Sequence, residues 1–271
     1  MVRSTARVSF AEAAERALVG ESERTTLAPV RRARWRWWAL LLPVAAVTSA
    51  CSSGPPTPSA FAGKSASQIL QVALHNAIRA GSLHYSVKTT GSAQQTVDGA
   101  SGSQGGFEVV TSAEGEVHIE VIGTTGYIAS PAEGLVATMG MTQSVAAANA
   151  GRWISMKSTD QPFSQLSQAV SFRSIIDEFT PDGPLHLVFT QIGGRTVGLV
   201  VGTGTASQAV KSYHVELAIS ASEPLLPVGG VLQITANGHT VTQTGVFAQW
   251  GKPIGLQVPP GPVPWDSLVP Q

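Results

Sequence analysis

An apolar run that ends near the chain's only cysteine constrains this sequence more than any other feature. Residues 37–47 are almost entirely apolar, and four arginines lie within residues 31–36. A positive flank, a short apolar segment and small residues after it are typical of a secretory signal peptide. A membrane-spanning helix needs roughly 20 apolar residues, whereas this run is shorter and Pro43 interrupts it.

Cys51 directly follows the small residues 48–50, where a bacterial lipoprotein carries its lipid. Thr48 stands where Leu or Val is usual. Residues 52–59 are rich in Ser, Pro and Gly, which predicts a flexible tether. The pattern resembles lipoproteins whose thiol receives a diacylglycerol and whose new N-terminus receives an acyl chain such as palmitate. The alternative, a membrane anchor or buried helix with an incidental cysteine, explains neither the position of Cys51 nor the tether.

The first thirty residues are long for a signal peptide and carry four glutamates. Two alternatives stay open, a true start near Val30 and a real cytoplasmic leader. Arg31 and Arg32 suggest twin-arginine export, but the residues after them fit that motif poorly, which favours ordinary Sec export. The predicted organisation is a leader with signal peptide over 1–50, a tether over 51–64, a folded domain over 65–260 and a Pro-rich tail over 261–271.

The net charge of zero hides an asymmetry around Cys51. Eight Lys/Arg and four Asp/Glu precede the cysteine, and nine and thirteen follow it, so the exported part carries −4. Nucleic-acid binding needs clustered basic residues, so we expect none. The exported part has no further cysteine, no Gly-x-Ser-x-Gly motif and no Ser-x-x-Lys motif. We therefore expect neither an enzyme nor a cofactor or metal.

Alternating and helical apolar patterns predict an α+β domain after the tether. Ser65 and Gln68 have capping-box spacing at the start of an amphipathic helix that Gly81 ends. One or two helices are predicted within 135–150, and two short ones within 163–179. The stretch 91–106 is either a loop or irregular edge strands. Strands are predicted around 83–87, 107–111, 117–121, 127–129, 152–156, 185–192, 195–201, 213–219, 231–236 and 240–248. Short turns between strands indicate an antiparallel sheet whose apolar face the helices cover.

Five segments carry a resemblance to a known family; they are residues 81–87, 121–128, 150–154, 226–228 and 250–260. Together they resemble the actinobacterial LppX/LprG-type lipoproteins, which have a LolA-like fold, over about residues 65–260. The resemblance implies a curved antiparallel half-barrel sheet with helices packed on its concave face. It also implies acylated lipids or glycolipids carried between the helices and the sheet. The Gly/Ser/Gln-rich stretch 91–106 and the sparsely charged surface depart from the family pattern.

Small and aliphatic residues on two helical segments are the expected lining of such a cleft. They are Leu70, Ala73, Leu74, Ala77 and Ile78 of the first segment, and Leu135, Val136, Met139 and Val145 of the second. The same residues would serve equally well in a closed helix-on-sheet core.

Two His–Glu pairs and two tryptophans are further candidates for a site. His118 with Glu120, and His214 with Glu216, could hold a metal only if their strands were neighbours; alternation along a solvated face explains both pairs more simply. Trp153 and Trp250 fit the core or its rim better than a sugar platform.

Two functions follow from these expectations. The first is an envelope lipoprotein, anchored by lipid on Cys51 to the outer face of the cytoplasmic membrane, that carries acyl lipids or glycolipids in an apolar cleft. The second is a closed-core envelope module for interaction or accessory work, without lipid cargo. A long apolar cavity would favour the first and a sealed core the second. The sequence names no protein partner.

Overall fold

The structure is a computed structural model that describes residues 58–92, 94–204, 210–236 and 238–268. Side chains are described throughout these ranges except at 204 and 210–212. The predictions for the leader, the signal peptide, Cys51 and most of the tether lie outside the described residues.

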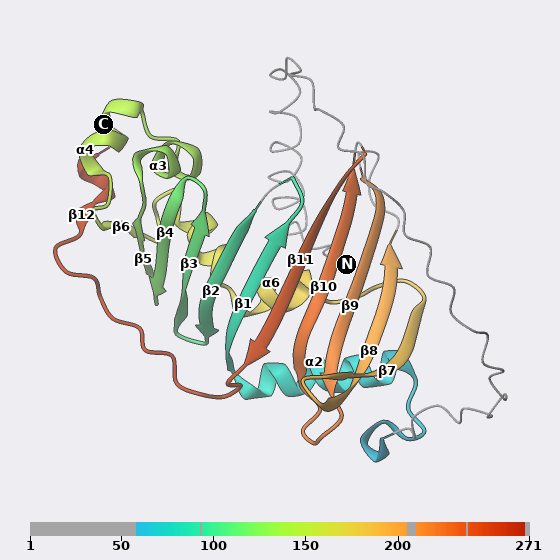
Figure 1. Cartoon of the computed structure of the whole chain (residues 1–271). Helices are drawn as coiled ribbons and strands as arrows, with labels where there is room; N and C mark the ends of the chain where they lie inside the picture. The colour runs from blue at the N-terminus through green and yellow to red at the C-terminus, as the bar shows by residue number, and fades with distance from the viewer. Residues whose placement is uncertain (1–57, 93, 205–209, 237, 269–271) are drawn as a thin grey trace.

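Twelve strands form one open, curved sheet (Figure 1). Their order across the sheet is β12-β6-β5-β4-β3-β2-β1-β11-β10-β9-β8-β7. Two antiparallel meanders meet where β1 pairs with β11, and only the short β12 pairs in parallel, with β6. The strands are β1 (Ser82–Thr90), β2 (Gln95–Gly102), β3 (Gly105–Ser112), β4 (Gly115–Ile122), β5 (Thr125–Ala129), β6 (Ile154–Lys157), β7 (Leu185–Ile192), β8 (Arg195–Gly204), β9 (Val210–Ser220), β10 (Pro227–Ala236), β11 (His239–Ala248) and β12 (Val263–Pro264).

The α-helices pack on one side of the sheet, which we call the concave face; the other side is the outer face (Figure 1). They are α2 (Ala66–Ala80), α3 (Ala132–Met139), α4 (Gln143–Asn149), α5 (Phe163–Ala169) and α6 (Phe172–Glu178), with single 3-10 turns η1 (Ser59–Phe61) and η2 (Trp265–Ser267) near the two ends. The predicted fold class, an α+β half-barrel with helices on the concave face, is confirmed.

Local sequence explains the ends of α2. The Ser65 hydroxyl accepts from the N–H of Gln68, while the Gln68 side-chain oxygen accepts from the N–H of Ser65 at 2.8 Å. This capping box satisfies two N–H groups that a helix start leaves without partners. Gly81 ends the helix at φ 75°, a left-handed conformation that glycine adopts without a steric penalty.

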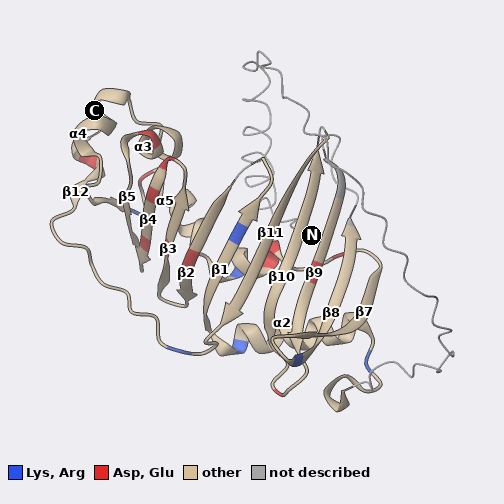
Figure 2. Cartoon of the chain, viewed as in Figure 1, with Lys and Arg blue, Asp and Glu red and all other residues tan. Residues whose placement is uncertain are grey.

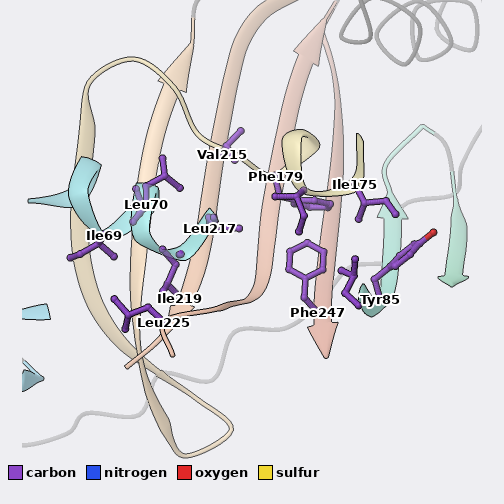
Figure 3. Close-up of a cluster of buried hydrophobic side chains, with 14 of the residues drawn as sticks. Ile69, Leu70, Tyr85, Ile175, Phe179, Val215, Leu217, Ile219, Leu225 and Phe247 are labelled. Carbon is purple, nitrogen blue, oxygen red and sulfur yellow. The ribbon is translucent and has the colours of Figure 1, made fainter. Parts of the chain in front are cut away.

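Two apolar clusters fill the layer between helices and sheet. The first lies between α2, α6 and strands β1 and β8–β11, and Figure 3 shows part of it. The second lies between α3, α4, α5 and strands β4–β6. The concave face therefore has two separate apolar centres along the sheet.

Three predicted boundaries differ from the structure. Residues 95–102 form β2, which pairs along its whole length with β1 and β3 and is not an edge strand. The predicted tether contributes Phe61, which is 1% exposed in the first cluster. The predicted tail does not leave the fold, because β12 pairs with β6 while Trp265 and Leu268 pack on the second cluster.

Candidate functional site

The predicted lipid-lining residues divide between the two clusters. Leu70 and Ala73 belong to the first cluster with Leu74 beside it, and Ala77 is fully buried. The second cluster holds Leu135 and Met139, with Val136 and Val145 packed against it. The structure brings the two sets to one face of the sheet but not to one common cleft, and their binding of lipid stays a prediction.

Ile78 does not lie on the buried side of α2, where the sequence pattern predicts it. Its side chain is 64% exposed, whereas the sequence placed it beside the buried residues of α2. Nine residues separate Ile69 from Ile78, which is two and a half helical turns at 3.6 residues a turn. The two side chains therefore point to opposite sides of α2, so Ile78 cannot line a cleft beneath the helix.

Phe179, directly after α6, closes the middle of the concave face. Its ring is fully buried and packs edge-on against Phe247 of β11, with centroids 5.4 Å apart (Figure 3). Beneath it the sheet offers Gly230 and Gly245, where an added Cβ would lie 2.8 Å and 3.0 Å from the ring. The two glycines let the aromatic ring lie directly on the backbone, so no open channel separates α6 from the sheet there.

The junction between α5 and α6 seals the neighbouring part of the face. A Cβ added at Gly106 of β3 would lie 2.8 Å from the carbonyl oxygen of Val170. The buried hydroxyl of Ser101 on β2 donates to that same carbonyl at 2.6 Å. The chain between the two helices thus touches the sheet directly and is held there by a buried hydrogen bond.

A buried polar cluster lies beneath α6. The Tyr85 hydroxyl donates to Glu108 Oε1 at 2.6 Å, across the intervening strand β2. Gln243, opposite Thr89 in the pairing of β1 and β11, makes a side-chain hydrogen bond to Glu178 at the end of α6. Among the described residues, Thr89 Oγ1 and Gln243 Oε1 are the buried side-chain oxygens without a hydrogen-bond partner.

Burial perturbs the acids of this cluster. It raises the pKa of Glu108 to about 7, although the hydrogen bond from Tyr85 acts in the opposite direction. It also raises the pKa of Glu178 to about 7, against the hydrogen bond from Gln243. Burial and then Glu108 raise the pKa of Tyr85 well above its usual value. The contact of α6 with the sheet therefore holds two carboxyl groups whose ionisation is opposed by burial.

A hollow lies on the outer face, not between helices and sheet. It measures about 250 Å³, and its side chains come from β3, β4 and the residue before β6; they are Phe107, Val109, His118, Glu120 and Trp153. The segment between β11 and β12 closes it through Gly255 and Gln257. A second hollow of about 200 Å³ lies near β6 and η2, beside the ion pair of Lys157 with Asp266 at 3.2 Å.

The sequence pattern pairs His118 with Glu120 on one strand face, but it does not place Trp153 beside them. The segment after β11 closes the hollow. The sequence predicts instead that this segment leads into a tail outside the fold. The other pair, His214 and Glu216, is hydrogen-bonded at 2.9 Å on β9. Because β4 and β9 are not neighbours in the sheet, the two His–Glu pairs cannot form one metal site.

Two further observations concern metals and membranes. In the described part of the chain, no group of three or more His, Cys, Asp or Glu is placed to hold a metal ion. The helices of the described ranges are all too short or too polar to cross a membrane.

No protein-family model matches the sequence, and a search of curated proteins finds no match. Among solved structures, the crystal structure of the Mycobacterium tuberculosis lipoprotein LppX is similar to this chain. The match covers 71% of this chain and 100% of LppX, with 16% identity and a TM-score of 0.43. LppX is a lipoprotein of the type that the sequence resembles.

Proposed function

We propose that this protein is an envelope lipoprotein, anchored through Cys51 to the outer face of the cytoplasmic membrane, which acts through its outer surfaces. The observation that carries this proposal is the filled layer between helices and sheet. Phe179 lies on Gly230 and Gly245, and the two hollows described above lie elsewhere. Among the described residues, the packing around Phe179 leaves no prepared space for acyl chains between α6 and the sheet.

Opening the layer would also cost free energy. Each square ångström of apolar surface returned to water costs about 25 cal/mol, and the rings of Phe179 and Phe247 would both be uncovered. The buried hydrogen bond from Ser101 to Val170 would be lost as well. These contacts favour a permanently closed core.

A second candidate function is lipid carriage after displacement of α5 and α6. The buried polar cluster favours it, because ionised Glu108 and Glu178 would weaken the seal between the two apolar clusters. Removing the seal would join Leu70 and Ala73 with Leu135 and Met139 along one apolar face. Each acyl methylene buried there would gain roughly 0.8 kcal/mol. The cargo would be an acylated lipid or glycolipid, as the sequence resemblance implies.

Replacement of Cys51 by alanine is expected to move the protein from the membrane fraction to the medium. The reason is that alanine has no thiol to carry a lipid. Fractionation of cells with an acyl-label assay measures the change. Ser52→Ala is the matched control, because it alters the neighbouring residue but keeps the thiol, and it should stay in the membrane fraction. Membrane retention of Cys51→Ala without acyl label would contradict the proposed anchor.

A further inference from the structure

The segment that joins β11 to β12, residues 249–262, is pinned along the outer face; we call it the strap (Figure 1). Near its start, the Ser82 hydroxyl donates to the carbonyl of Lys252 at 2.7 Å. In its middle, the N–H of Gln257 donates to Glu120 Oε1 at 2.7 Å. At its end, the N–H of Val263 donates to the carbonyl of Trp153 at 2.8 Å. The strap is therefore a fixed wall of the hollow beneath it.

The floor of this hollow is aromatic and apolar. Side chains alternate between the two faces of β3. Glu108 points to the concave face, where it reaches Tyr85, so its neighbours Phe107 and Val109 point into the hollow on the outer face. Trp153 stands edge-on to the His118 ring, with centroids 6.1 Å apart. All four side chains are half-buried, which leaves ring surface available to a ligand.

The hollow lies in a strongly acidic part of the chain. Residues 89–151 contain six carboxylates and no Lys or Arg; the six are Asp98, Glu108, Glu114, Glu116, Glu120 and Glu133. Figure 2 shows acidic residues on β2 and β4 with no basic residue on β2–β5. Glu116 lies at the rim, with its carboxylate 3.6 Å from His118. Strand pairing puts Asp98, Glu116 and Glu120 on the outer face, whereas Glu108 faces the concave side. These three carboxylates make the field over this part of the outer face negative.

Glu120 is the charged group inside the hollow. Its Oε1 atom accepts a hydrogen bond from the N–H of Gln257, which is a neutral donor. Partial burial raises the pKa of Glu120, and the hydrogen bond from Gln257 only partly opposes this. A cation placed in the hollow would compensate the charge of this partly buried carboxylate.

We propose that the hollow under the strap binds an organic cation of the ammonium type, held between the rings of Phe107 and Trp153 and the carboxylate of Glu120. An ammonium group is attracted to the face of an aromatic ring and pairs with a carboxylate. The volume of about 250 Å³ exceeds the roughly 30 Å³ share of a single water and admits a small organic ion. An anion would find no Lys or Arg in the lining and would be repelled by Glu120, and a neutral ligand would leave the carboxylate uncompensated.

This inference deepens the proposed function, since it gives the outer surface a ligand, but the binding does not depend on the anchor at Cys51. The test uses the full chain in a maltoside detergent that carries no cationic or phosphocholine head group. Choline is the probe, and its neutral carbon isostere, 3,3-dimethylbutanol, is the ligand control. Titration is followed by calorimetry and by the indole N–H resonance of Trp153, assigned with Trp153→Phe.

Choline is expected to bind at least about tenfold more tightly than its neutral isostere. A tenfold ratio corresponds to about 1.4 kcal/mol, which the contacts of a cation with an aromatic face and a carboxylate can supply. Glu120→Gln should abolish that preference. Glu114→Gln removes a carboxylate of the same acidic stretch outside the hollow and should keep the preference. Equal binding of the two ligands, wild-type affinity in Glu120→Gln, or no shift of the Trp153 resonance with choline would each overturn the proposal. The anchor is tested independently: Cys51→Ala should lose membrane anchoring but keep choline binding, so a failure of one hypothesis can be told from a failure of the other.

Discussion

Replacing Phe179 with alanine is expected to lower the free energy of unfolding by about 3–5 kcal/mol, the usual cost of a large-to-small change in a core. The ring is fully buried and lies against Phe247, Gly230 and Gly245. Neither glycine has a side chain that can move into the vacated space. Chemical denaturation followed by circular dichroism measures the loss, and the melting temperature should fall by about 6–20 °C.

Phe107→Ala is the matched control, because Phe107 is only half-buried on the outer face and should cost clearly less. The lipid-carriage alternative leads to a different result for Phe179→Ala. If acyl chains occupied this layer, the truncation would enlarge their site, and bound lipid would offset the loss. A variant that keeps wild-type stability while gaining lipid would contradict the closed core.

Glu108→Gln is expected to stabilise the domain by roughly 1–3 kcal/mol at pH 8 and to change little at pH 4. The folded pKa of about 7 lies above the ordinary value of 4.5, so the folded state holds this proton more tightly than the unfolded state. The stabilisation from the protonated carboxyl is full below about 4.5 and is lost as the pH rises toward 7. Glutamine is neutral at every pH, and its carbonyl oxygen can still accept from Tyr85.

Denaturation curves between pH 4 and 8 test this expectation. The wild type should lose stability through that range, the single variant should lose less, and Glu108→Gln with Glu178→Gln should be nearly flat. The exposed Glu114 serves as control: the Ser112 hydroxyl lowers its pKa, so Glu114→Gln should not remove the loss. Parallel pH profiles for wild type and Glu108→Gln would show that Glu108 is not held protonated in the fold.

Much of the fold follows from local sequence signals. The helix over 66–80 is marked by Ser65, Gln68 and Gly81, which act through contacts within a few residues. The hairpin of β7 and β8 follows from two alternating runs around Gly193 and Gly194. Such elements are predictable because their stabilising contacts are close in sequence.

Strand β2 and residues 261–268 were harder to predict because the residues they pack against lie in other segments of the chain. Gly99 in β2 has no side chain, and Tyr85 of β1 lies over it, with its hydroxyl oxygen 2.6 Å from the position of an added Cβ. Residues 261–268 contain prolines that suggested departure from the fold. Trp265 and Leu268 of this segment nevertheless pack on the second cluster. No local sequence pattern reveals that contact.

The candidate sites show the same limit. Small residues such as Ala73 suggested spare volume, but Phe179 comes from a distant segment and fills the space over Gly230 and Gly245. The hollow on the outer face depends on the strap crossing β4 at Glu120. Alternation along a strand shows which residues share a face, but not which distant segment covers them.

Lipid analysis of a soluble form that begins at Ser52 tests the closed core most directly. The protein would be purified without detergent, incubated with phospholipid and glycolipid vesicles, separated from them, extracted and analysed by mass spectrometry. The closed core predicts no stoichiometric acyl lipid before or after incubation, with circular dichroism showing a folded domain. About one acyl lipid per folded chain, retained through separation, would contradict it and establish the carrier.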